Sequence, residues 1–123
     1  MIKTGLTYTV RLVVNETNTA MALGSGDLPV FATPAMVAMM EKAAMLAVAD
    51  SLPVGSTTVG GHIETSHIKP SPAGAEVTAT ATLDKVDERR LYFRLEARQG
   101  EMIIGKGTHL RFIVDRNGFM AGI

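Results

Sequence analysis

The segment FATPAMVAMMEKAAMLAVADS, residues 31–51, determines the fold. Thr33 is a candidate N-cap, and the proline after it suits the first helical position, because the N–H that proline lacks would have no intrahelical acceptor there. Between positions 35 and 49 every residue is apolar except Glu41 and Lys42. A surface helix normally has one apolar stripe, so a helix that is apolar almost all round is expected to be enclosed by protein. The run is too short, and too charged at its middle, for a membrane span.

Glu41 lies in the middle of this helix, where an unpaired carboxylate is costly to bury. Such a cost is tolerated mainly at functional sites, so Glu41 is the leading candidate for a catalytic group. The alternative is that Glu41 pairs with a lysine or an arginine and has only a structural role. The helical methionines Met36, Met39, Met40 and Met45 either fill the core or line an acyl pocket.

Length and composition restrict the classes of function. The chain has 123 residues, which predicts one domain over residues 1–123. Lys plus Arg and Asp plus Glu number 12 each, so charge gives no reason to expect a nucleic acid or a membrane as partner. The absence of cysteine excludes disulfides, zinc–thiolate sites and thiol nucleophiles. The first residues show no export signal, so a cytoplasmic protein is expected, and no cofactor is expected.

Most of the remaining chain has the alternating pattern of β-strands. Strands are expected at residues 6–14, 56–69, 77–83, 91–97 and 102–114. A bulge or a close backbone approach is expected at Gly60 and Gly61. An ordered loop is expected at residues 15–27, and turns are expected at 84–90, near Gly100 and at 115–118.

The order of these elements predicts an α+β fold. Successive strands with short connections pair antiparallel, and a sheet next to a single apolar helix can bury that helix by curling around it. One small sheet cannot cover a helix on every side. A second copy of the chain is the simplest cover, so we expect a homodimer, with assembly into tetramers left open.

Two segments resemble a known family: VFATPAMVAMMEKAAM at residues 30–45 and TTVGGHIETSHIKP at residues 57–70. Over about residues 6–114 the chain resembles hotdog-fold acyl-CoA thioesterases of the type that includes the fluoroacetyl-CoA thioesterases. The resemblance implies a curved antiparallel sheet wrapped around one long helix, and hydrolysis of an acyl-CoA to free acid and CoA. Members specialised for the fluorinated acetyl group carry aromatic lid residues before the helix. Here that stretch is LGSGDL, so a broader acyl-CoA thioesterase is expected.

The same resemblance implies the site residues. Thr33, Glu41 and His67 take the places of the family's catalytic Thr, Glu and His, and Gly60 matches a glycine whose N–H contacts the thioester carbonyl. On this interpretation Glu41 is a general base or a nucleophile, and His67 passes a proton to the leaving thiolate. Because they lack a Cβ, Gly60 and Gly61 also allow a substrate carbonyl to approach an N–H donor of the backbone.

Several alternatives remain open. His62 and His109 are rivals of His67, and His62 and His67 should point to opposite faces of a regular strand. Thr33 would lie about 12 Å from Glu41 along an unbroken helix at ~1.5 Å per residue, so either the helix starts later or two subunits share the site. The rival functions are an acyl-CoA dehydratase of the same fold and a non-catalytic dimer that binds an acyl-CoA or another small ligand.

Overall fold

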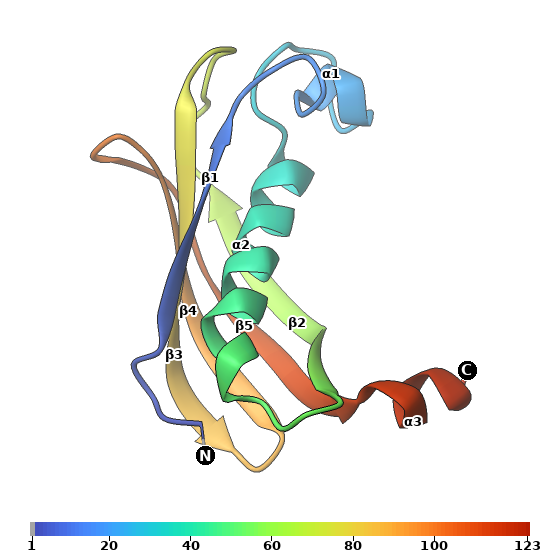
Figure 1. The fold of residues 1–123 in the computed structure, drawn as a ribbon. Coiled ribbons are helices and arrows are strands. Elements are labelled where there is room, and N and C mark those ends of the chain that lie inside the picture. Colours follow the sequence, from blue (N-terminus) through green and yellow to red (C-terminus); the bar gives the residue numbers. More distant parts are fainter. Residues whose placement is uncertain (1) are drawn as a thin grey trace.

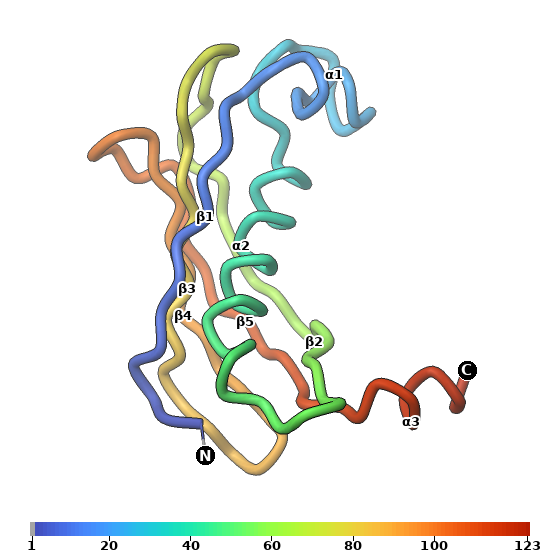
Figure 2. The backbone as a smooth tube through the Cα atoms, viewed as in Figure 1, coloured from blue at the N-terminus to red at the C-terminus, as the bar shows by residue number. Residues whose placement is uncertain are grey.

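The computed structural model describes residues 2–123, over which an antiparallel sheet of five strands curls around one long helix (Figure 1). The strands are β1 (Thr7–Val13), β2 (Ser56–His67), β3 (Glu76–Asp87), β4 (Arg90–Gln99) and β5 (Met102–Asp115). Their order across the sheet is β1-β3-β4-β5-β2, so β1 and β2 are the edge strands. The helix α2 (Thr33–Val48) lies across one face of the sheet (Figure 2). The expected α+β architecture is confirmed.

Small and flexible side chains form the face of α2 that meets the sheet. Its buried residues are Met36, Met39, Met40, Ala43, Ala44 and Val48. They share a core with the inward side chains of the central strands, among them Val77, Ala79, Ala81, Leu83, Leu91, Phe93, Leu95 and Ala97. Gly105 of β5 marks a close approach, since a Cβ there would lie 2.6 Å from the sulfur of Met36. Three of the four helical methionines therefore fill the core.

The opposite face of α2 remains exposed in a single chain. Pro34, Ala38 and Lys42 are exposed along it, and Met45 is 37% exposed. Lys42 is the only charged residue of this set, whereas a helix face that meets water is normally polar. One chain thus covers only one face of α2, although the sequence predicts a helix that is enclosed on all sides.

Both ends of α2 differ in detail from the prediction. The helix begins at Thr33 and its N-cap is Ala32, which has no capping side chain, so the assignment of Thr33 as N-cap is wrong. The proline, predicted at the first helical position, is the second helical residue and still lies within the first turn, where its missing N–H costs no intrahelical hydrogen bond. After Val48 the chain continues as one turn of 3-10 helix, η1 (Ala49–Ser51), before the expected break.

Two short helices replace segments that were expected to be a loop and a turn. The first is α1 (Ala20–Leu23), where the Thr19 side chain accepts from the N–H of Ala22 and Gly24 ends the helix with φ 73°. The second is α3 (Arg116–Ala121), where the Asp115 side chain accepts from the N–H of Gly118. α3 extends away from the sheet (Figure 1).

The bulge expected at the glycine pair is confirmed. The pairing of β2 with β5 shifts between Gly60 and His62 and then runs regularly to His67. His62 and His67 therefore point to opposite faces, as expected. The β3–β4 turn is tighter than expected, with Glu88 at φ 56°. None of the helices within residues 2–123 has the length and apolar character needed to cross a membrane.

Candidate active site

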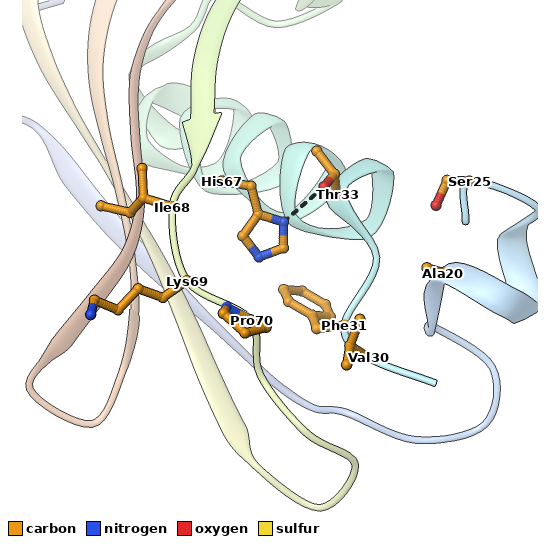
Figure 3. Close-up of a pocket in the computed structure, with 9 residues that line it drawn as sticks. All are labelled: Ala20, Ser25, Val30, Phe31, Thr33, His67, Ile68, Lys69 and Pro70. Carbon is orange, nitrogen blue, oxygen red and sulfur yellow. Dashed lines mark hydrogen bonds between the residues drawn. The ribbon is translucent and has the colours of Figure 1, made fainter. Parts of the chain in front are cut away.

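Thr33 and His67 meet at one end of the helix although they are 34 residues apart in the sequence. Thr33 is the first residue of α2 and His67 is the last of β2, and Thr33 Oγ1 lies 2.8 Å from His67 Nδ1 (Figure 3). Phe31 packs edge-on against the imidazole, with ring centroids 6.0 Å apart. The pair lines a cavity of about 260 Å³, which Ile68 and Lys69 border as well. The Thr33 hydroxyl thus faces an imidazole instead of capping the helix.

Burial gives His67 the protonation state that a general base needs. It lowers the pKa of His67 from the usual 6.5, so the imidazole is neutral at pH 7. In the tautomer with hydrogen on Nε2, Nδ1 accepts a hydrogen bond from the Thr33 hydroxyl. Nε2 itself is buried and has no hydrogen-bond partner within residues 2–123. A hydroxyl and a neutral imidazole at this distance form the basic unit of nucleophilic catalysis.

Glu41 belongs to a second cluster, farther along the helix. It lines a cavity of about 290 Å³ together with Gly60, Gly61, His62, Ile63 and His109. A Cβ placed on Gly60 would lie 2.9 Å from Glu41 Oε2, so the carboxylate lies directly against the backbone of the bulge. The Glu41 side chain is 42% exposed, and Arg111 Nη1 lies 3.6 Å from Oε2. The expectation of an enclosed, unpaired carboxylate is therefore wrong for the single chain.

Arg111 on β5 was not identified as a site residue from the sequence, and His109, on the same strand, was named only as a rival of His67. Arg111 is 6% exposed, and it donates from Nε to Thr58 Oγ1 at 2.8 Å and from Nη2 to the Thr58 carbonyl at 2.9 Å. Its Nη1 lies 3.2 Å from His109 Nε2. The alternation did not indicate them, because Leu110, Phe112 and Val114 make the other face of β5 the apolar one, whereas the structure turns His109 and Arg111 toward the buried face. Two polar side chains on such a face indicate a site or a buried network.

The structure therefore brings Thr33 to His67, and Gly60 to Glu41, but the two pairs belong to separate cavities within one chain. α2 runs without interruption from Thr33, so the possibility that the helix starts later is wrong. Eight residues of helix place Thr33 and Glu41 about 12 Å apart along the axis, beyond hydrogen-bond reach. Two explanations were considered for a site that contains both residues, a later helix start and a site shared by two subunits. The structure excludes the first of these.

No metal site accompanies either cluster. Within residues 2–123 there is no group of three His, Asp or Glu side chains that could hold an ion. The side chains and backbone of the two clusters offer groups for proton transfer, for nucleophilic attack by a hydroxyl or a carboxylate, and for hydrogen bonding from N–H groups.

Comparison with known proteins identifies the family. Residues 14–117 match the model of the fluoroacetyl-CoA-specific thioesterase family, FlK. The chain is 40% identical over 94 residues to the fluoroacetyl-CoA thioesterase of Streptantibioticus cattleyicolor, which covers 76% of this chain and 68% of that protein.

Solved structures agree with this match. The chain superposes on a point mutant of the fluoroacetyl-CoA-specific thioesterase FlK with a TM-score of 0.91, at 34% identity, with 99% of this chain and 95% of the other covered. It superposes on a Thermus thermophilus protein described as a thioesterase superfamily member with a TM-score of 0.90, at 28% identity over 98% and 90% of the two chains. The chain therefore belongs to the fluoroacetyl-CoA-specific thioesterase family and is an acyl-CoA thioesterase with the hotdog fold.

Proposed function

We propose that Thr33 and His67 are the reacting pair of this thioesterase, with Gly60 and Glu41 completing the site. The observation that carries the proposal is the 2.8 Å contact between Thr33 Oγ1 and His67 Nδ1 at the edge of a cavity. The neutral imidazole would take a proton from the Thr33 hydroxyl, or from a water molecule that the hydroxyl orients.

The reaction consumes one water molecule and yields a carboxylic acid and CoA. The oxygen nucleophile attacks the thioester carbonyl, the carbonyl oxygen gains negative charge, and the C–S bond then breaks. His67 returns the proton to the leaving thiolate. If Thr33 attacks directly, water cleaves the resulting ester with the same imidazole as base. The N–H groups of the bulge at Gly60 and Gly61 would stabilise the oxyanion.

Glu41 is assigned to the same substrate carbonyl. Because its carboxylate lies against Gly60, a thioester bound at that glycine would be within reach of Oε2. Buried Arg111 lies 3.6 Å away, so a guanidinium faces the carboxylate from the side of β5. Glu41 would then act on water as a general base, or attack the carbonyl in place of Thr33 or water, in which case CoA leaves and water hydrolyses the resulting anhydride.

A homodimer would unite the two clusters. β2 is an edge strand of the described chain, and the exposed stripe of α2 is largely apolar. Antiparallel pairing of β2 with a second copy, centred between Ile63 and Glu64, would place His67 opposite the partner's Gly60. Each site would then take Thr33 and His67 from one subunit, and Gly60 and Glu41 from the other.

The substrate is proposed to be broader than fluoroacetyl-CoA. The relatives are named for fluoroacetyl-CoA, and one solved structure of FlK is described as a complex with fluoroacetate and CoA. Residues 23–28 of this chain, LGSGDL, contain no aromatic side chain to close over a small acyl group. A more open entrance favours acceptance of several acyl groups.

The test is release of free thiol from acetyl-, fluoroacetyl-, hexanoyl- and benzoyl-CoA. The protein contributes no thiol of its own, since it has no cysteine. Thr33→Val keeps the shape of the side chain and removes the hydroxyl, and His67→Ala removes the base. Each should lower kcat by ~10²–10⁴-fold, the usual effect of losing an acid–base group. Wild-type rates in both variants would refute the assignment, and strict preference for fluoroacetyl-CoA would refute the broader substrate range.

A further inference from the structure

The bulge that carries Gly60 is braced from β5. Gly60 pairs with Arg111, and the next pair is His62 with Leu110, so Gly61 has no partner in the ladder. A Cβ on Gly61 would overlap the ring of Phe112, and one on Gly60 would crowd Glu41. A glycine pair can adopt many backbone conformations, so a single geometry at this point requires restraints from outside the pair.

His109 supplies the restraint on the C-terminal side of the bulge. Its ring is 3% exposed, and Nδ1 lies 2.7 Å from the backbone carbonyl of His62. A carbonyl only accepts hydrogen bonds, so Nδ1 must carry the hydrogen. Nε2 is then the acceptor, and it faces Arg111 Nη1 at 3.2 Å. Since an arginine only donates, both neighbours select the same neutral tautomer.

Arg111 supplies the restraint on the N-terminal side. Its two hydrogen bonds to Thr58 hold the strand two residues before Gly60. The charged and titratable groups around His109 are Arg111, Glu41 and the side chain of His62, whose backbone carbonyl also faces the ring. Burial is the largest cause that lowers the pKa of His109, and Arg111 lowers it further, so the ring stays neutral at pH 7. His109 and Arg111 together form what we call the β5 clamp.

We propose that His109 is a positioning residue, which acts through the β5 clamp to hold the peptide groups of Gly60 and Gly61 in place for the thioester oxyanion. This inference rests on the proposed role of Gly60. His109 transfers no proton, because its donor nitrogen is engaged with the His62 carbonyl and its acceptor nitrogen with Arg111. A displacement of about 1 Å at an oxyanion donor can cost ~10²-fold in rate.

Three substitutions test the clamp. The amide nitrogen of asparagine can occupy the place of Nδ1, so His109→Asn should keep kcat within about fivefold of wild type. His109→Gln carries its amide farther out, and His109→Phe has no donor, so both should lower kcat by ~10–10²-fold with KM changed less than about twofold. If His109→Phe does not fold, the Asn and Gln pair decides the question. Equal kcat values for Asn and Gln would overturn the proposal.

Two further measurements separate this inference from the proposed function. Amide hydrogen exchange at residues 60–62 should be faster in His109→Gln than in His109→Asn. Unchanged exchange would show that His109 does not hold the bulge, and faster exchange with unchanged kcat would show that the bulge geometry does not matter for the reaction. Nitrogen-15 NMR of the His109 ring should show the Nδ1–H tautomer from pH 6 to 8, and an imidazolium or an Nε2–H signal would contradict the clamp. Thr33→Val and His67→Ala test the reacting pair without involving His109.

Discussion

Mixed dimers provide the sharpest test of the site. Glu41→Gln removes the carboxylate with little change of size, and His67→Ala removes the imidazole. Within one chain Glu41 lies about 12 Å along the helix from Thr33, the partner of His67, at ~1.5 Å per residue. Proton transfer needs heavy atoms within ~2.6–3.2 Å of each other. At this separation one chain alone does not bring both groups to the same thioester, whereas the proposed two-fold dimer would.

The expected recovery follows from counting sites. When equal amounts of the two inactive variants exchange subunits at random, about half of the dimers contain one chain of each kind. In such a dimer one site receives both substitutions and the other receives neither. About one quarter of all sites are then wild type, so kcat per chain should recover to about one quarter of the wild-type value.

Thiol release from saturating acyl-CoA measures the recovery, before and after subunit exchange of differently tagged variants. Exchange of each variant with a tagged copy of itself is the control, and it should remain inactive. If the mixture never exceeds the mean of the two variants although mixed dimers are isolated by their two tags, the site lies within one chain. Full activity of Glu41→Gln on its own would instead remove Glu41 from the mechanism.

Three other predictions concern pH, the bulge and the core. Activity should fall as pH drops through the pKa of His67, at a midpoint below the usual 6.5. Burial also lowers the pKa of His109, so between the folded and the unfolded pKa values the unfolded chain binds more protons than the folded one. Urea titrations should therefore show the free energy of unfolding decreasing as pH falls below 6.5. Gly61→Ala should destabilise the fold by ~1–3 kcal/mol in a thermal melt, because its Cβ would overlap the Phe112 ring. Gly60→Ala should lower kcat with a smaller loss of stability, because the one crowded contact of its Cβ, at 2.9 Å, is with the flexible end of Glu41. Met36→Ala should cost ~2–5 kcal/mol of stability at any protein concentration, whereas Met45→Ala, on the exposed stripe, should mainly weaken the dimer in sedimentation experiments.

The elements predicted best are those with strong periodicity. The long helix, the alternating strands and the bulge at Gly60 are all confirmed, because each leaves a local signature in residue type and spacing. The short helices α1 and α3 were missed because a helix of four to six residues spans fewer than two turns and so cannot repeat an apolar pattern. Their signals were the capping side chains of Thr19 and Asp115, which are equally common in turns.

The candidate site was predictable to the extent that it matches a family pattern. Thr33 and His67 were expected together and lie in contact. Arg111 was missed, since a charged residue in a strand is normally assigned to the solvent face. Its buried guanidinium is hydrogen-bonded to Thr58 on the neighbouring strand β2 and to His109, two residues earlier on β5. Partners of this kind become visible only once the register is known.

Gly105 links the packing of the core to the spacing of the reacting atoms. It is the register partner of His67, and its missing side chain leaves room for Met36, which lies about one turn along α2 from Thr33. A larger residue at this position would displace the end of the Met36 side chain and crowd the Ser66 carbonyl, next to His67, and would so disturb the spacing of the threonine hydroxyl and the imidazole. A homologue could therefore keep every reacting group and still be a poor enzyme. Assigning activity within this family should rest on a small residue at the position of Gly105 as well as on the polar site residues.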